Sequence, residues 1–123
     1  TMDWNFRNDQ PIYSQLIQRL TEAIVSGVYA PGEKLPSVRE LALEAGVNPN
    51  TVQRSLTELE REGLVFSQRT AGRFVTENEN MIVNAKLRIA DERVSEFLRS
   101  MNTLGCGRQE IISLIEGAKE DEE

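Results

Sequence analysis

The feature of this sequence that most constrains its fold is a pair of helix signals separated by only a few residues. Ser37-Val38-Arg39-Glu40 is a capping box, in which the serine and glutamate side chains satisfy backbone amides at a helix start. Gly46 suits the left-handed residue that ends this helix, and Asn48-Pro49 supplies the N-cap and first residue of the next. Two helices joined by so tight a turn must cross steeply, so the sequence predicts a helix-turn-helix.

The segments around this pair complete a small head. Apolar residues at helical spacing over residues 12–25 predict a preceding amphipathic helix. After the pair, residues 64–68 and 73–76 are rich in β-branched and aromatic side chains and predict two short strands. We therefore expect a mainly α fold with a small β wing, in which residues 1–76 form a winged helix-turn-helix DNA-binding domain.

From Glu77 onward the sequence changes to a heptad pattern, in which apolar residues recur at alternating spacings of four and three. These residues are Val83, Leu87, Ala90, Val94, Phe97, Met101 and Leu104. A last helix is predicted over residues 110–119, with Ile111 and Ile115 among its apolar residues. Two helices cannot enclose a core, so they must pack against the head, another chain or both. We interpret residues 77–123 as a helical dimerisation domain with an acidic tail at 120–123.

The composition excludes most catalytic chemistry. The 123 residues include no histidine, which removes Ser-His-Asp and Cys-His catalysis and most catalytic zinc sites. The single cysteine, Cys106, cannot form an internal disulfide and lies between two glycines, as a small turn residue would. No stretch approaches the roughly 18 apolar residues of a membrane span, and no apolar leader begins the sequence. We expect a cytoplasmic protein, not an enzyme, with no catalytic residues, cofactor, metal or membrane partner.

The net charge of −6 at first argues against a nucleic-acid partner. Counted by segment, however, the acidic surplus lies outside the helix-turn-helix. Residues 34–75 carry six basic and five acidic side chains, whereas residues 76–123 carry six basic and eleven acidic ones. The predicted head is therefore close to neutral, and its charge does not oppose DNA binding.

The second helix of the pair carries the candidate DNA contacts, because a helix-turn-helix places the N-terminal end of that helix in the major groove. Here that end offers Asn50, Thr51, Gln53 and Arg54. The amides can pair with adenine, Arg54 with guanine or phosphate, and Thr51 with a thymine methyl or phosphate. On a lone helix these residues would be an ordinary polar face, but the capped turn and the following ribbon favour DNA.

Three further arginines each have two interpretations. Arg39, in the first turn of its helix, suits a phosphate, or else pairs with Glu40 or Glu44. Arg69 and Arg73 flank the wing turn, where they would enter a minor groove or clamp the DNA backbone. Alternatively, they keep an exposed hairpin edge soluble.

Five motifs in order make residues 10–76 resemble the GntR family of bacterial transcription regulators. The motifs are Pro11-Ile12-Tyr13-Ser14-Gln15-Leu16, the run from Gly27 to Arg39, Asn50-Thr51-Val52-Gln53-Arg54, Glu62-Gly63-Leu64 and Gly72-Arg73-Phe74-Val75. The short two-helix region after them resembles the YtrA-type subfamily. The resemblance implies a homodimer that binds double-stranded DNA at a palindromic operator, usually as a repressor and often at transporter operons.

The resemblance also implies which residues contact DNA. They are Arg39, Asn48, Asn50, Thr51, Gln53, Arg54, Arg69, Thr70 and Gly72. The sequence departs from many relatives at Pro49, where they carry arginine, and at Thr70, where they carry glycine. The region after the head is too short to enclose an effector as larger relatives do, so a small-molecule effector would have to bind between subunits. The alternative function is a winged helix that contacts a partner protein through the same face.

Overall fold

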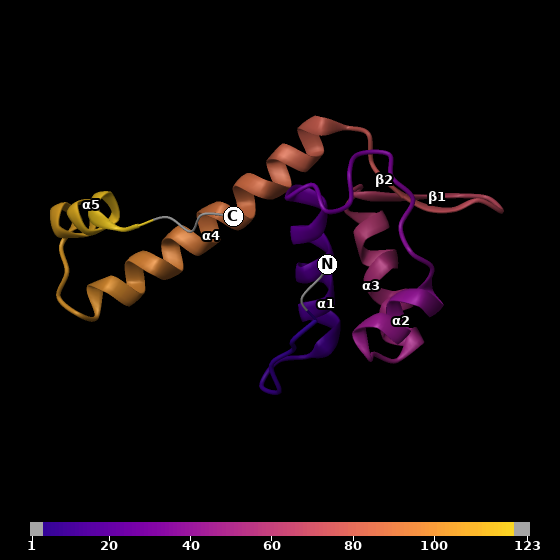
Figure 1. The fold of residues 1–123 in the computed structure, drawn as a ribbon, viewed down its shortest axis with the longest axis horizontal. Helices are drawn as coiled ribbons and strands as arrows, with labels where there is room; N and C mark the ends of the chain where they lie inside the picture. The colour runs from indigo at the N-terminus through magenta and orange to yellow at the C-terminus, as the bar shows by residue number, and fades with distance from the viewer. Residues whose placement is uncertain (1–3, 120–123) are drawn as a thin grey trace. The chain divides into compact units, whose positions relative to one another are not determined.

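The computed structural model describes residues 4–119 of the chain, and the acidic run 120–123 lies outside them. The elements in order are α1 (Ile12–Val25), α2 (Val38–Ala45), α3 (Pro49–Arg61), β1 (Val65–Gln68), β2 (Gly72–Val75), α4 (Glu79–Asn102) and α5 (Arg108–Gly117) (Figure 1). This order confirms the mainly helical fold with a small wing. Among the described residues no helix is long and apolar enough to cross a membrane. The chain divides into two compact units, with the boundary between Lys86 and Leu87.

The helix-turn-helix forms as the sequence predicts. The Ser37 hydroxyl accepts a hydrogen bond from the amide of Glu40 (3.1 Å), and the Glu40 carboxylate accepts one from the amide of Ser37 (2.9 Å). Gly46 ends α2 in the left-handed conformation, with φ of 68°. Asn48 then caps α3, because its side-chain oxygen accepts from the amide of Asn50 at 2.8 Å. The turn is therefore closed by local hydrogen bonds on both sides.

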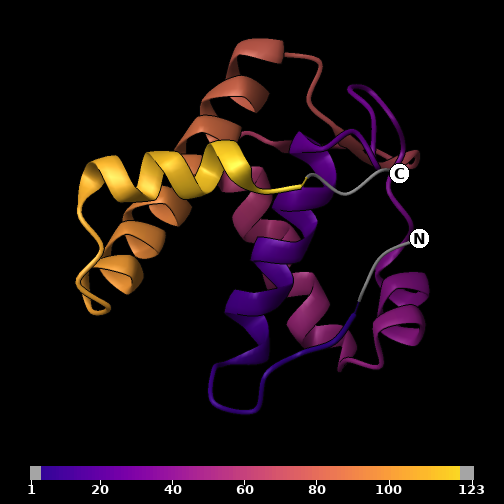
Figure 2. The ribbon, with the colours of Figure 1, turned by 60° about the vertical axis from the view of Figure 1, so that its left-hand side comes forward.

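The core of the first unit lies between α1, α2 and α3, and α1 and α3 run side by side (Figure 2). Each helix contributes leucines with no exposed surface: Leu16 and Leu20 from α1, Leu41 from α2, and Leu56 and Leu59 from α3. Burial of one such side chain is worth about 1.5–3 kcal/mol. This cluster therefore fixes α3 against the other two helices and leaves its opposite face outward.

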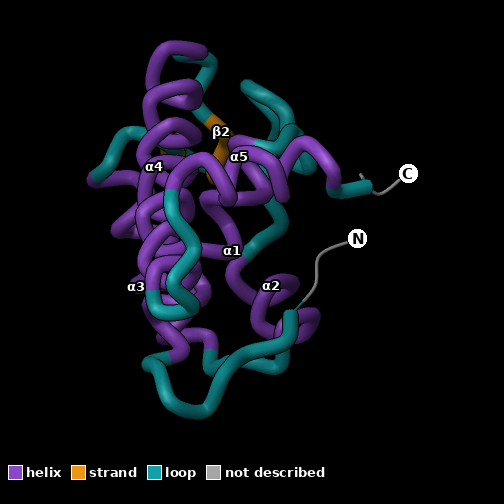
Figure 3. Tube along the Cα trace, turned by 90° about the vertical axis from the view of Figure 1, so that its left-hand side faces the viewer, coloured by secondary structure: helices purple, strands orange, loops and turns teal. Residues whose placement is uncertain are grey.

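The wing is an antiparallel pair, drawn in orange in Figure 3, in which Val65 lies opposite Val75. The edge of β2 that faces away from β1 pairs with the segment before α2. The amide of Leu35 donates to the carbonyl of Arg73, and the amide of Val75 donates to the carbonyl of Glu33, both at 2.9 Å. Because β2 is hydrogen-bonded on both sides, the base of the wing is tied to the head.

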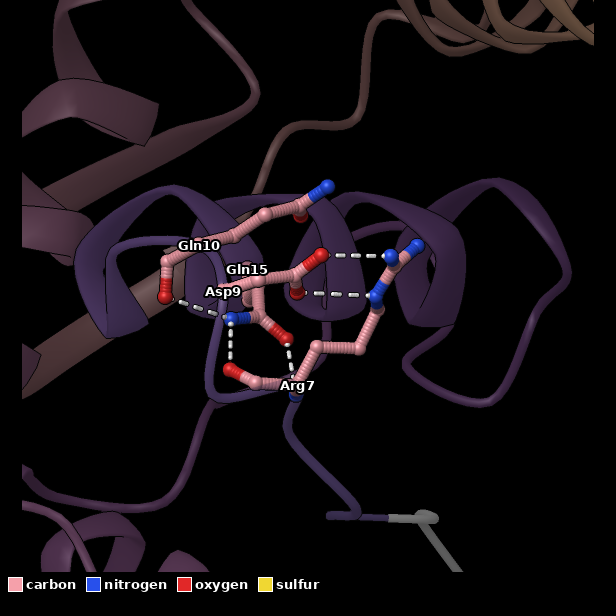
Figure 4. A network of polar contacts seen from close by, with 4 residues as sticks. All are labelled: Arg7, Asp9, Gln10 and Gln15. Carbon is pink, nitrogen blue, oxygen red and sulfur yellow. Dashed lines mark hydrogen bonds and ion pairs between the residues drawn. The ribbon is translucent and has the colours of Figure 1, made fainter.

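The segment before α1 is fixed by one buried side chain, that of Gln15 (Figure 4). Its amide group accepts a hydrogen bond from the backbone of Arg7 at 2.7 Å and donates to the carbonyls of Arg7 and Gln10 at 2.8 and 3.0 Å. Arg7 in turn forms two hydrogen bonds with the Asp9 carboxylate. The first turn of α1 is thereby held in a defined position.

The first turns of α4 belong to the first unit. Ala85 is buried in its core and Ile82 packs against it. Gly63, at the end of the α3 region, has φ of 84°, and a Cβ there would lie 2.3 Å from the terminal methyl of Met81. The compact unit therefore extends to Lys86, whereas the sequence placed the boundary of the head at residue 76. The heptad pattern predicts the helix α4, but it does not show that the first turns of α4 pack on the core of the first unit.

Candidate nucleic-acid interface

The exposed face of α3 carries the polar residues that the sequence assigned to it. The apolar residues of α3 are buried: Val52, Leu56 and Leu59. Asn50, Gln53 and Arg54 are exposed, and Thr51 is half-buried. Asn48 uses its side-chain oxygen as the helix cap, which leaves its NH₂ group available for a second contact. The structure thus brings five of the assigned residues together around the first turns of α3.

One of these residues has a partner that sequence reasoning missed. The guanidinium carbon of Arg54 lies 4.3 Å from the ring centroid of Tyr13, in the first turn of α1. The next residue, Ser55, is fully buried, and its hydroxyl lies 2.9 Å from the carbonyl of Thr51 and 3.4 Å from that of Tyr13. The available signal was the place of Tyr13 in the motif at 11–16, but no local pattern pairs it with α3.

An open groove of about 270 Å³ surrounds this contact. It is lined by Tyr13, Gln53, Arg54, Thr57, Glu58 and Arg61. Within the groove, the Arg61 Nε donates to one carboxylate oxygen of Glu58 at 3.0 Å, and its Nη2 donates to the other. These hydrogen bonds hold the pKa of Glu58 below its usual range. The groove therefore contains one paired arginine, Arg61, and one that stacks on a ring, Arg54.

Arg73, which flanks the wing turn and was predicted as a DNA contact, forms an ion pair with Glu60 of α3. Its Nε donates to the Glu60 carboxylate at 2.5 Å, and the Ser67 hydroxyl donates to the same oxygen at 2.6 Å. Burial opposes ionisation of Glu60, but these hydrogen bonds outweigh it and lower the pKa of that carboxyl. The cause is strand register: Ser67 and Arg73 are opposite each other, so both side chains reach Glu60. Arg73 anchors the wing rather than extending from it.

The wing turn presents Arg69 and Thr70, both exposed. Thr70 has φ of 65°, a left-handed conformation that is unfavourable for a β-branched residue. Gly72 has φ of 117°, and a Cβ there would lie 3.0 Å from Cε of Lys34. Thr70, where the family resemblance led us to expect glycine, therefore has a backbone conformation that favours glycine.

Arg39 is exposed near the start of α2, and the two carboxylates proposed as its partners have other contacts. Glu40 completes the capping box, and Glu44 accepts a hydrogen bond from the indole of Trp4 at 3.1 Å. Over residues 4–119 no ion pair involves the guanidinium of Arg39. Neither carboxylate therefore pairs with Arg39 in the described chain, and its contact with a DNA phosphate stays a prediction.

The helices α4 and α5 and the connection between them expose several large apolar side chains, each between 40 and 74% exposed. They are Val83, Leu87, Val94, Phe97, Leu104, Ile112, Leu114 and Ile115. Ala90 is also exposed and Met101 is half-buried. Ile111, which the sequence placed in the same interface, is only 3% exposed, so its side chain already packs within the single chain. Ile111 is therefore covered within one chain, and its place in the dimer interface stays a prediction.

No group of three histidine, cysteine or carboxylate residues that could hold a metal ion occurs in the described part of the chain. Cys106 is half-buried with a free thiol, in the connection between α4 and α5.

Comparison with known proteins gives one consistent family. Residues 12–75 match the family of bacterial regulatory proteins described as the gntR family. The chain is 37% identical to the uncharacterized HTH-type transcriptional regulator YhcF of Bacillus subtilis, over 96% of this chain and 95% of that protein. It is 41% identical to the HTH-type transcriptional repressor YtrA of the same organism, over 75% of this chain and 72% of that protein.

Solved structures are similar over the head and over most of the chain. A GntR family transcriptional regulator from Listeria monocytogenes superposes with a TM-score of 0.86 at 35% identity, covering 93% of this chain and 100% of that one. The DNA-binding domain of AraR in complex with operator ORX1 is similar with a TM-score of 0.55 at 27% identity, covering 58% of this chain and 93% of that one.

Proposed function

Because the chain belongs to the gntR family of bacterial regulatory proteins, in its YtrA-type subfamily, we propose that this transcription regulator is a repressor that binds a palindromic operator as a homodimer. The observation that carries the proposal is the exposed N-terminal face of α3, presented by a capped helix-turn-helix turn. The similarity to the transcriptional repressor YtrA and to the operator-bound DNA-binding domain of AraR supports the proposal.

In the proposed complex, α3 lies in the major groove. The amides of Asn50 and Gln53 pair with adenine edges, and Arg54 contacts a guanine or a phosphate. Arg39 binds a backbone phosphate from the start of α2, where the helix dipole adds to its charge. Arg69 follows the backbone or the minor groove from the wing turn.

The dimer forms through the exposed apolar residues of α4 and α5. Single chains seldom leave so much apolar side-chain surface to solvent, and a second copy supplies the chemistry that covers it. A two-fold protein also matches a palindromic site, with half-sites about one helical turn apart. The proposed interface consists of Val83, Leu87, Ala90, Val94, Phe97, Met101, Leu104 and Ile115.

For the regulated genes we propose a transporter operon. The YtrA-type resemblance suggests a transporter operon, and this suggestion comes from the family and not from any residue of the site. Mapping the binding sites of the tagged protein on the genome of its source tests it. Sites confined to genes unrelated to transport would contradict it.

Selection from random-sequence duplex DNA tests the function directly. We expect an inverted repeat to be enriched, and its affinity to fall steeply with salt, because phosphate contacts release counterions. Absence of any enriched sequence would contradict the proposal. A partner-protein role predicts a different result, in which no DNA sequence is preferred and the salt dependence is flat.

A further inference from the structure

Arg54 occupies an unusual position for an exposed arginine. Its guanidinium lies over the Tyr13 ring, at 4.3 Å from carbon to centroid. A cation–π contact occupies no acceptor oxygen or nitrogen, so the N–H donors of the guanidinium can still form hydrogen bonds. Within residues 4–119 no hydrogen bond or ion pair involves those donors. The side chain is therefore held in place but keeps its hydrogen-bonding capacity.

The neighbour best placed to consume that capacity is Glu58. It lies four residues after Arg54 on α3, the spacing at which opposite charges pair on a helix. Both oxygens of Glu58 instead accept hydrogen bonds from Arg61. The Glu58 side chain is 18% exposed and that of Arg61 is 76% exposed, so the pair lies at the edge of the groove. Arg61 thus occupies the carboxylate whose spacing along α3 suits pairing with Arg54.

The ring and the guanidinium are also held in one rigid frame. Ser55 is fully buried beside Arg54, and its hydroxyl reaches the carbonyl of Tyr13 at 3.4 Å. The first turn of α1, which carries Tyr13, is fixed further by the hydrogen bonds of Gln15. Any shift of α1 against α3 would therefore move the ring away from the guanidinium.

We propose that Tyr13 and Arg61 are positioning residues for Arg54. The ring of Tyr13 orients the guanidinium, and Arg61 keeps Glu58 from pairing with it, so that acceptor oxygens of DNA meet an ordered and unpaired cation. This inference rests on the proposed function, since it concerns how the same face binds DNA.

The test is a double-mutant cycle on the full-length chain, with a fluorescein-labelled duplex recovered from the random-sequence selection. Tyr13→Leu removes the ring and is expected to weaken binding about two- to fivefold, the scale of an exposed cation–π contact. Tyr13→Phe retains the ring and is expected to retain most of the affinity. In an Arg54→Ala background Tyr13→Leu should cause no further loss.

A second cycle tests Arg61. Arg61→Met releases Glu58 and is expected to weaken binding about twofold at low salt, the scale of a helix ion pair. Adding Glu58→Gln should restore the affinity, because no carboxylate is then left to capture Arg54. Glu58→Gln alone is the control for the change in net charge. If Arg61 itself contacted DNA, the double variant would remain weak.

Different results contradict the proposed DNA binding and the positioning role of Tyr13 and Arg61. If the unaltered protein selects no DNA sequence, the proposed function fails and this inference fails with it. If it binds but Tyr13→Leu weakens binding equally with and without Arg54, the positioning role is overturned. Melting temperatures show whether Tyr13→Leu folds. If Tyr13→Leu does not fold, the Arg61 cycle tests the proposal instead, because the Arg61 side chain is largely exposed and its replacement should not disturb the fold. The salt slope of Arg54→Ala distinguishes a phosphate, which lowers the slope by about one, from a guanine edge.

Discussion

The head and the C-terminal helices use apolar residues in opposite ways. In the head, leucines from three helices are completely buried and hydrophobic contacts close the core within one chain. Beyond Lys86, the described helices contain one large apolar side chain that is fully buried, Ile111, and many that are half-exposed. The head therefore buries most of its large apolar side chains within one chain, whereas the described helices beyond Lys86 leave most of theirs exposed, at the surface assigned to the proposed dimer. The predictions below test this division.

The largest effect is expected in the head. Leu56→Ala removes a side chain with no exposed surface and leaves a cavity between α1 and α3, so the free energy of unfolding should fall by about 2–5 kcal/mol. Leu43→Ala is the matched control, because Leu43 is 79% exposed and its loss should change stability by about 0.5 kcal/mol or less. Urea unfolding measures both. Equal losses would mean that the core does not lie where the structure places it.

The next effect concerns the C-terminal helices. Leu87→Glu with Val94→Glu places two charges on the exposed apolar seam and should leave a monomer, because an unpaired charge is not tolerated in an apolar interface. Light scattering should then report the mass of one chain, 13.9 kDa. Asn84→Glu with Ser95→Glu adds the same charge at exposed positions off the seam and should leave the dimer intact. A dimer in both variants would move the interface elsewhere.

Arg54→Ala sharpens the comparison by separating DNA contact from dimer contact. Operator affinity should fall by about 1–3 kcal/mol, as for loss of one charged contact to a base or phosphate, while the oligomeric state stays unchanged. Arg88→Ala removes the same charge from the exposed surface of α4 and is the control. Fluorescence anisotropy at fixed salt measures both. An unchanged affinity for Arg54→Ala would remove this residue from the interface.

A smaller effect is expected from the carboxylate that anchors the wing. The lowered pKa of Glu60 means that its contribution to stability is present above the unfolded pKa of about 4.3 and is lost as the pH falls through the lower folded value. Glu60→Gln should therefore cost about 1 kcal/mol at pH 7 and progressively less below about pH 4. Thermal unfolding at several pH values checks this. A constant difference would show that Glu60 acts without its charge.

The smallest expected effect is a gain in stability. Thr70→Gly replaces a β-branched residue at φ of 65°, so it should stabilise the wing by about 0.5–1 kcal/mol. The change leaves the cores of both units untouched, and a melting curve suffices to measure it. Thr70→Ala retains a Cβ and should show at most a part of the gain. A loss with glycine would mean that the Thr70 side chain contributes more than its backbone costs.

Most of the fold was predictable, because the signals that define it are local. The capping box at 37–40, the left-handed Gly46 and the Asn48-Pro49 start are contacts between residues at most a few positions apart, and the structure contains all of them. The last helix was predicted over 110–119 and lies at 108–117, an error of two residues, because Gly107 caps it without a side-chain signal.

The candidate site was predictable only in part. The exposed residues of α3 follow from helical spacing, since the buried face determines the opposite one. The fate of Arg73 does not follow, because its pairing with Glu60 joins a strand to a helix and depends on how the two pack. Likewise, the apolar residues of the last helix do not show that Ile111 is buried and Ile115 exposed within one chain, because that depends on what packs against each side chain.

The sequence by itself determined the helices, their caps, the tight turn between α2 and α3 and the family to which these motifs belong, because each depends on interactions between residues close in the chain. The tertiary structure alone decided which arginines are ordered, paired or unpaired. Arg54 stacks on Tyr13 and Arg73 pairs with Glu60 because packing brings distant segments together. The partner of a long, flexible, charged side chain depends on that packing.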